Sequence, residues 1–108
     1  MSSSAEFMEY VTGNMSGAGT VTARKMFGEY GVYCDGKIFA LICDNQLFIK
    51  PTDQGKALLE NVAFAPPYPG ARPYLLITDD LIDDCEQLSE LVRVTVDALP
   101  LPKKRKVK

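Results

Sequence analysis

The chain has 108 residues, of which 46% are hydrophobic and 24% are charged, and it contains no histidine. This length and apolar content predict one domain with a core of its own and argue against intrinsic disorder. The lack of histidine excludes a Ser–His–Asp or Cys–His catalytic group and an imidazole-ligated metal site. We therefore expect no catalytic residues, no bound metal and no cofactor.

The net charge of −2 conceals a strong asymmetry along the chain. Residues 1–102 carry twice as many acidic as basic side chains, whereas five cations occupy the last six positions. We predict a single domain over residues 1–101 and a flexible basic tail over residues 102–108. The tail is either a solvated arm or a salt-sensitive contact for nucleic acid. The candidate contacts are Lys103, Lys104, Arg105, Lys106 and Lys108.

The cysteines and the N-terminal residues indicate the cellular compartment of the protein. Cys34, Cys43 and Cys85 are odd in number and form no Cys-x-x-Cys pair, which suits a reducing cytosol better than a secreted disulfide scaffold. The N-terminus lacks the cationic start of a signal peptide, and no apolar run reaches the roughly 20 residues of a membrane span. We expect a soluble cytoplasmic protein without membrane contact.

Two segments open the domain. After Ser3 and Ser4, either of which can cap a helix, Phe7, Tyr10 and Val11 recur at helical spacing. Residues Thr20–Phe27 are richer in β-branched and aromatic side chains and predict a strand.

A meander of strands follows. Asp35-Gly36 and Asp44-Asn45 are typical two-residue hairpin turns, and they separate apolar segments over residues 30–34, 38–42 and 46–50. The next segments are a short helix over residues 52–61, capped by Thr52, and an extended Pro-rich loop over residues 65–73. A strand over residues 74–78 comes next, and a final helix is capped by Asp83 or Asp84.

The two turns predict which residues lie opposite each other. Val32 would face Phe39, Tyr30 would face Leu41, and Leu41 would face Phe48. One face of the sheet is then wholly apolar and is expected beneath the helices, with Tyr33, Ile38, Ala40, Ile42, Leu47 and Ile49. The other face is mixed, with Tyr30, Val32, Cys34, Lys37, Phe39, Leu41, Gln46, Phe48 and Lys50.

The mixed face leaves three interpretations open. The last helix or the Pro-rich loop covers it, or it binds a protein partner or a second copy, or its rings stack on single-stranded nucleic acid. The segment Arg24–Gly28 has a similar ambiguity, because Phe27 and the two cations could contact a partner, or Phe27 could belong to the core. Together these segments give the candidate partner-binding residues Arg24, Lys25, Phe27, Tyr30, Lys37, Phe39, Phe48 and Lys50.

Five carboxylates gather in the segment Asp79–Glu86. Their spacing lacks the central glycine of an EF-hand loop, and carboxylates before a helix commonly serve as caps. We interpret this segment as helix capping rather than as a cation site.

Five short motifs occur in order along the chain: Arg24-Lys25-Met26-Phe27-Gly28, Gly31-Val32-Tyr33, Asp35-Gly36, Phe39-Ala40 and Leu47-Phe48-Ile49-Lys50-Pro51. With these motifs, residues 4–99 resemble the N-terminal domain of the TfoX/Sxy competence regulators. This resemblance implies a two-layer α+β fold of the secretion-chaperone type without catalytic residues. It also implies a bacterial cytoplasmic role in switching on DNA-uptake genes alongside the cyclic-AMP receptor protein. The family's longer members continue into a helical C-terminal domain, for which this chain offers no counterpart.

We therefore predict an α+β domain with a helix, four strands, a helix, a strand and a final helix around an antiparallel sheet. Its expected function is that of a non-enzymatic regulatory or adaptor domain acting through protein–protein contacts in the transcription of competence genes. The expected partner is a regulator of the cyclic-AMP receptor protein type or the RNA polymerase assembly, and a homodimer is open. The alternative is a direct, weak DNA-binding or RNA-binding module that uses the basic tail and the aromatic sheet face.

Overall fold

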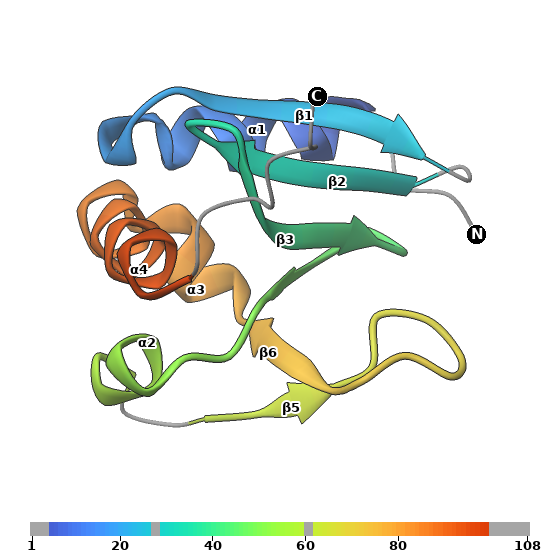
Figure 1. The fold of residues 1–108 in the computed structure, drawn as a ribbon. Helices are drawn as coiled ribbons and strands as arrows, with labels where there is room; N and C mark the ends of the chain where they lie inside the picture. The colour runs from blue at the N-terminus through green and yellow to red at the C-terminus, as the bar shows by residue number, and fades with distance from the viewer. Residues whose placement is uncertain (1–4, 27–28, 60–61, 100–108) are drawn as a thin grey trace, which may run out of the picture.

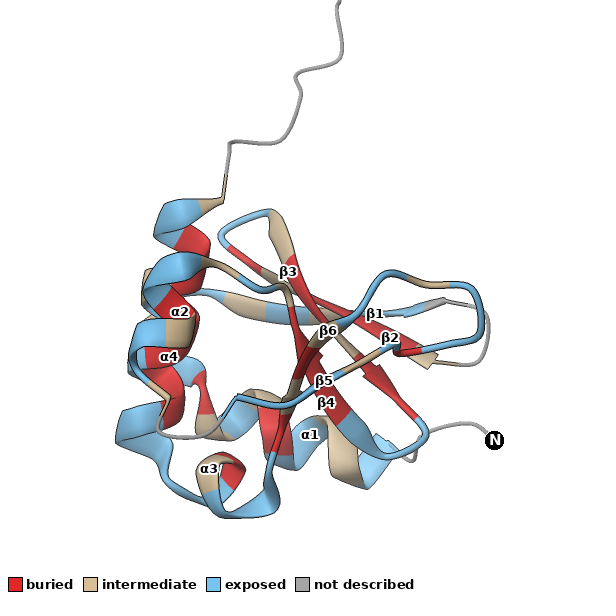
Figure 2. Cartoon of the chain, turned by 90° about the horizontal axis from the view of Figure 1, so that it is seen from below, coloured by how far each residue is buried: buried red, intermediate tan, exposed pale blue. Residues whose placement is uncertain are grey.

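A computed structural model describes residues 5–26, 29–59 and 62–99. These residues form an antiparallel sheet with the strand order β1-β2-β3-β4-β6-β5, and the main helices pack on one side of it (Figures 1 and 2). The α+β prediction is confirmed. The elements are α1 (Ala5–Asn14), the 3-10 helix η1 (Ser16–Ala18), β1 (Val21–Met26), β2 (Glu29–Cys34), β3 (Lys37–Cys43), β4 (Gln46–Ile49), α2 (Asp53–Ala57), β5 (Phe64–Ala65), β6 (Tyr74–Ile77), α3 (Asp79–Asp83) and α4 (Cys85–Ala98).

The longest helix, α4, forms where the sequence predicts it. Asp84 is the N-cap, because its side chain accepts a hydrogen bond from the backbone N–H of Gln87 at 3.1 Å. The apolar stripe of α4 is buried against the sheet, with Leu88, Leu91 and Val92 among its members. Asp84 also ends α3, a separate short helix that sequence analysis did not predict.

Both hairpin turns occur at the predicted positions. Asp35 and Gly36 have φ values of 51° and 87°, and Asp44 and Asn45 have values of 54° and 55°. Two successive positive φ angles belong to the turn whose twist matches that of antiparallel strands, and Asp, Asn and Gly tolerate them best. These residues therefore fix the ends of β2, β3 and β4.

The register between β2 and β3 differs from the prediction. The structure pairs Tyr33 with Ile38, but then shifts by one residue, so that Val32 lies opposite Ala40 rather than Phe39. Phe39 is thus an extra residue on β3, as in a β-bulge. The predicted register is wrong beyond this point, although the predicted register of β3 with β4 is confirmed.

The bulge changes which side chains face the helices. Tyr30, Val32 and Phe39 lie in the hydrophobic core with the inward residues of β3 and β4, and Phe39 is fully buried. Conversely, Tyr33 and Ile38 lie outside that core and are half-buried. The predicted division into an apolar face and a mixed face is therefore wrong for β2 and the first half of β3.

The segment between β4 and β6 has more structure than the predicted helix and loop. Thr52 caps α2 as predicted, but the helix ends at Ala57 and a short strand, β5, pairs with β6. Between β5 and β6 the chain turns at Gly70, with a φ of 87° and a hydrogen bond from the N–H of Ala71 to the carbonyl of Tyr68. Pro followed by a Gly with positive φ is the composition of a type II turn.

Two further predictions concern the limits of the chain. The helix cap at Ser3 or Ser4 and the basic tail over residues 102–108 lie outside the described residues. Among the described residues, no helix combines the length and the apolar composition that crossing a bilayer requires.

Candidate functional site

The side of the sheet that faces away from the helices carries a contiguous apolar surface, which we call the outer face. Cross-strand pairs join Tyr33 to Ile38, Leu41 to Phe48 and Phe48 to Leu76, so these side chains point to the same side. None of them belongs to the hydrophobic core beneath the helices. The outer face consists of Tyr33, Ile38, Leu41, Phe48, Tyr74 and Leu76.

The side chains of the outer face are less exposed at its centre than at its margin. Phe48 retains only 3% of its accessible surface, and Leu41 and Leu76 lie opposite it on the two neighbouring strands. Tyr33, Ile38 and the two flanking leucines are half-buried. The face is therefore a shallow apolar surface with a buried aromatic centre rather than a cleft.

The β5–β6 loop borders one end of the outer face. Burial is the main cause that raises the pKa of Tyr74, and the neighbouring Tyr68 and Cys43 raise it further. Tyr68 belongs to this loop, and Pro67 beside it is buried. Burial likewise raises the pKa of the Cys43 thiol to about 11, with Glu29 and Asp44 adding to the effect. Cys43 and Pro67 are thus buried and Tyr74 half-buried at this end of the face, whereas Tyr68 is exposed.

Among the predicted partner-binding residues, Tyr30 and Phe39 lie in the core. For these two rings the structure agrees with the interpretation in which the chain's own elements cover them. Phe48 lies on the outer face but is nearly buried. Lys50 directly follows β4 and is half-buried, and Phe27 lies outside the described residues.

Lys37, another of the predicted partner-binding residues, connects the sheet to the end of α4. Its Nζ donates hydrogen bonds to the carbonyl oxygens of Val96 at 2.9 Å and Leu99 at 3.2 Å. These carbonyls belong to the last turn of α4, where a cation satisfies unpaired acceptors and the negative end of the helix dipole. The bond ties β3 to the end of α4, so Lys37 holds the two layers together.

Arg24 and Lys25 remain exposed on β1. Arg24 pairs with Gly31 and Lys25 with Tyr30, so the two cations lie on opposite faces of the sheet. Arg24 shares the side of Tyr33, at the margin of the outer face. The structure thus brings together Arg24 and Phe48 on one side, and separates them from Lys25 and Lys37.

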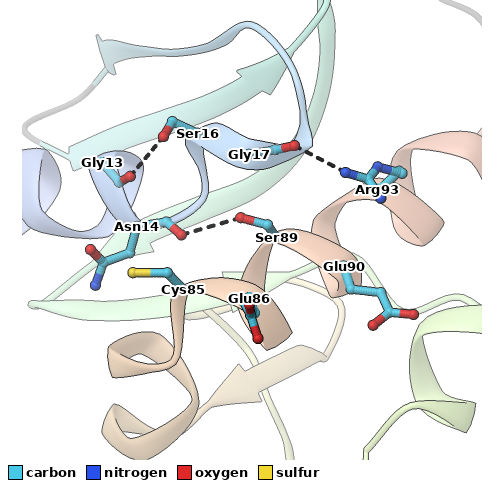
Figure 3. A pocket seen from close by; sticks show the side chains of 9 residues that line it. All are labelled: Gly13, Asn14, Ser16, Gly17, Cys85, Glu86, Ser89, Glu90 and Arg93. Carbon is cyan, nitrogen blue, oxygen red and sulfur yellow. Dashed lines mark hydrogen bonds between the residues drawn. The ribbon is translucent and has the colours of Figure 1, made fainter.

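A pocket of about 660 Å³ lies between α4 and the end of α1 with η1 (Figure 3). Two of its polar side chains bond to backbone across the pocket: Ser89 donates to the carbonyl of Asn14 at 3.3 Å, and Arg93 donates to the carbonyl of Gly17 at 3.0 Å. These bonds fasten η1 to α4, which is a structural reason for the polar residues. We therefore do not assign this pocket as the functional site.

The acidic segment before α4 has the capping role predicted for it. Asp84 caps α4, and Asp83 accepts a hydrogen bond from the hydroxyl of Tyr10 across the α1–α3 contact. Across residues 5–26, 29–59 and 62–99, no group of three histidine, cysteine or acidic side chains could hold a metal ion.

Tyr33, Ile38, Tyr74 and Leu76 belong to the outer face without having been predicted there. The segment Tyr74–Ile77 is apolar at every position and does not indicate which side chains face outward, and the pairing of β6 with β4 joins segments far apart in the sequence. For Tyr33 and Ile38, the bulge at Phe39 reverses the predicted side.

Two comparisons relate this chain to known proteins. The family model for the TfoX N-terminal domain matches residues 14–99, which include all strands of the described sheet. An uncharacterized 12.7 kDa protein in the trpE 5' region of Spirochaeta aurantia is 39% identical over 108 residues. That alignment covers 100% of this chain and 93% of the relative.

Proposed function

This chain belongs to the TfoX N-terminal domain family, and from that premise we propose that it is a cytoplasmic regulatory or adaptor domain that acts by contacting another protein. The family is associated with the regulation of competence and is a regulatory type of domain rather than a known enzyme family. The proposed role is the transcriptional control of DNA-uptake genes, in company with a protein that itself binds the promoter or the polymerase.

The observation that carries this proposal is the outer face. Six apolar side chains share this side of the sheet, and five of them, all except Phe48, keep part of their surface accessible to solvent. Contiguous apolar surfaces on soluble domains mark interaction sites. Tyr33 and Tyr74 supply aromatic side chains of the kind enriched in interfaces, and Phe48 is a buried aromatic centre between them. The proposed partner offers a complementary apolar surface.

Leu41→Lys tests the proposal. Leu41 is half-buried on the outer face, so the substitution places a charge within the proposed interface while the chain still folds. Leu58→Lys is the matched control, because Leu58 is an exposed leucine at the end of α2 and does not belong to the strands that carry this face. We expect Leu41→Lys to abolish partner co-purification from bacterial cytoplasm or self-association in light scattering, and Leu58→Lys to retain both. Equal behaviour of the two variants would contradict the proposal.

A direct nucleic-acid contact is the second candidate, because the half-buried rings of Tyr33 and Tyr74 lie on one face, where unpaired bases could stack. Its cations would come from the basic tail. Deleting residues 103–108 is then expected to remove binding to single-stranded DNA, and the affinity of the full chain should fall steeply with salt. Binding that survives both the deletion and high salt would argue for a contact through the domain itself.

A further inference from the structure

β1 forms one margin of the sheet, with β2 on one side and no described strand on the other (Figure 1). Edge strands of this kind expose unpaired backbone groups unless the chain covers them. β1 is six residues long and contains neither proline nor glycine. It is therefore long enough to pair with another extended segment.

One hydrogen bond establishes which backbone groups of β1 point outward. The carbonyl of Thr20 accepts a hydrogen bond from the N–H of Asp35 at 2.9 Å, so Thr20 directs its backbone toward β2. In an antiparallel ladder this direction alternates along the strand. The N–H and C=O groups of Val21, Ala23 and Lys25 consequently point away from the sheet. Among the described residues, no group forms a hydrogen bond with these outward-pointing N–H and C=O groups.

The side chains along this edge have a distinct charge pattern. Val21 and Ala23 are partly buried against the core, whereas Arg24 and Lys25 are exposed. Among the described residues, the ion pair within 4.0 Å joins Lys56 to Asp53. Neither Arg24 nor Lys25 has a carboxylate partner among these residues. The edge is therefore apolar at its start and doubly positive toward its end.

We infer that β1 accepts an extended acidic segment of a partner protein as an additional antiparallel strand. Because Arg24 and Lys25 project to opposite faces, the segment needs two adjacent acidic residues, one for each face. Small or β-branched residues would follow them, opposite Ala23 and Val21. The inference rests on the proposed function and names the chemistry of the partner segment.

The same pattern disfavours pairing between two copies of this chain. Edge lysines commonly prevent self-association of sheets, and two adjoining β1 strands would bring four cations into one short ladder. An acidic strand removes that repulsion and gains two opposite-charge pairs. Arg24 and Lys25 thus disfavour pairing with a second copy of β1 and favour pairing with an acidic strand.

The test uses two synthetic peptides, acetyl-Glu-Glu-Val-Thr-Val-amide and its counterpart with two lysines in place of the glutamates. Binding is followed by the backbone amide resonances of the isotope-labelled full chain. We expect the acidic peptide to shift the resonances of β1, and the lysine peptide to bind at least about tenfold more weakly. Shifts confined to other elements, equal binding of both peptides, or no binding would overturn the inference.

Two variants sharpen the test. Ala23→Pro removes an outward N–H that β2 does not use and should abolish peptide binding, whereas Ala23→Ser keeps this group and should retain it. The double variant Arg24→Glu with Lys25→Glu alters two exposed residues and should reverse the preference toward the lysine peptide. An unchanged preference would overturn the inference even if Ala23→Pro fails to fold.

The peptide assay separates this inference from the proposed function. Leu41→Lys leaves β1 intact, so it should bind the acidic peptide like the unmodified chain. If the peptide fails to bind while Leu41→Lys still loses its protein partner, the inference at β1 is wrong and the outer face stands. If the peptide binds but Leu41→Lys retains the partner, the outer-face proposal is wrong.

Discussion

Lys37 is the residue whose observed role differs most from its predicted one. A lysine beside aromatic residues on a strand indicates a contact surface. The Nζ of Lys37, however, donates hydrogen bonds to the carbonyl oxygens of Val96 and Leu99. The sequence cannot reveal this contact, because 59 residues separate Lys37 from Val96 and only the packing of α4 brings them together.

Lys37→Met should therefore reduce stability. It keeps the aliphatic stem but removes two charge-assisted hydrogen bonds at a helix end, and we expect a loss of about 1 kcal/mol in urea unfolding. Lys25→Met, an exposed lysine, should change the free energy of unfolding by less than about 0.5 kcal/mol. If Lys37→Met matches this control in stability but loses partner capture, Lys37 is a contact residue as the sequence suggested.

Cys43 gives the fold a dependence on alkaline pH. Burial raises its pKa from 9.0 to about 11, so above pH 9 the unfolded chain releases a proton that the folded chain retains. The stability from this group is complete below pH 9 and is lost as the pH rises toward 11. Cys43→Ala should show a shallower decline in the free energy of unfolding over this interval. An identical slope in both proteins would contradict the assignment.

At the scale of elements, β3 shows why the sheet was predicted only in part. The turns at its two ends were recognisable because Asp-Gly and Asp-Asn accept the positive φ angles that short hairpins need. The bulge was hidden, because the run Ile38–Ile42 is apolar at every position and gives no alternation that a one-residue shift would break. Burial of Phe39 beside Ala40 depends on the helices above them.

Phe48 and Leu41 should respond differently to the same substitution, although they face each other across β3 and β4. Phe48→Lys buries a charge where 3% of the surface is exposed, and we expect a loss of about 3 kcal/mol or more. Leu41→Lys should cost about 1 kcal/mol, since the lysine can reach solvent. Thermal unfolding measures both, and equal losses would show that the outer face is covered in solution.

Two helical glycines test the packing of α2 on α4. A Cβ at Gly55 would lie 3.0 Å from Thr52 Oγ1, 3.1 Å from Thr95 Oγ1 and 3.3 Å from Leu91 Cδ1, whereas one at Gly13 would meet nothing within 4 Å. Gly55→Ala should destabilise the fold, because Leu91 and Thr95 are buried and cannot move apart freely.

Gly13→Ala is the matched control in α1 and should stabilise the chain by up to about 1 kcal/mol through helix propensity. Chemical denaturation compares the two variants. A stabilising Gly55→Ala would mean that α2 packs more loosely on α4 than the structure describes.

At the scale of the whole molecule, the sequence predicted the class of fold and the family but not the complete sheet. Local turns and helix caps were sufficient for β2 to β4 and for α4. The order β4-β6-β5 depends on pairing between segments separated by the Pro-rich loop, and no local pattern encodes it. The outer face could not be assembled without that order, because Tyr74 and Leu76 complete it.

The outer face also gives the molecule two unlike sides. The main helices lie on one side of the sheet (Figure 2), with acidic residues in the first turns of α3 and α4, and the outer face lies on the other side. The proposed function depends on this division, since a partner that binds the sheet leaves the helical side in solvent.

Photocross-linking in living bacterial cells tests this division most directly. A benzophenone amino acid replaces Ile38 on the outer face in one variant and the exposed Glu90 on α4 in the other. The account predicts a cross-link to a second protein from position 38 and none from position 90. A cross-link from position 90 alone would contradict it and would assign recognition to the helical side.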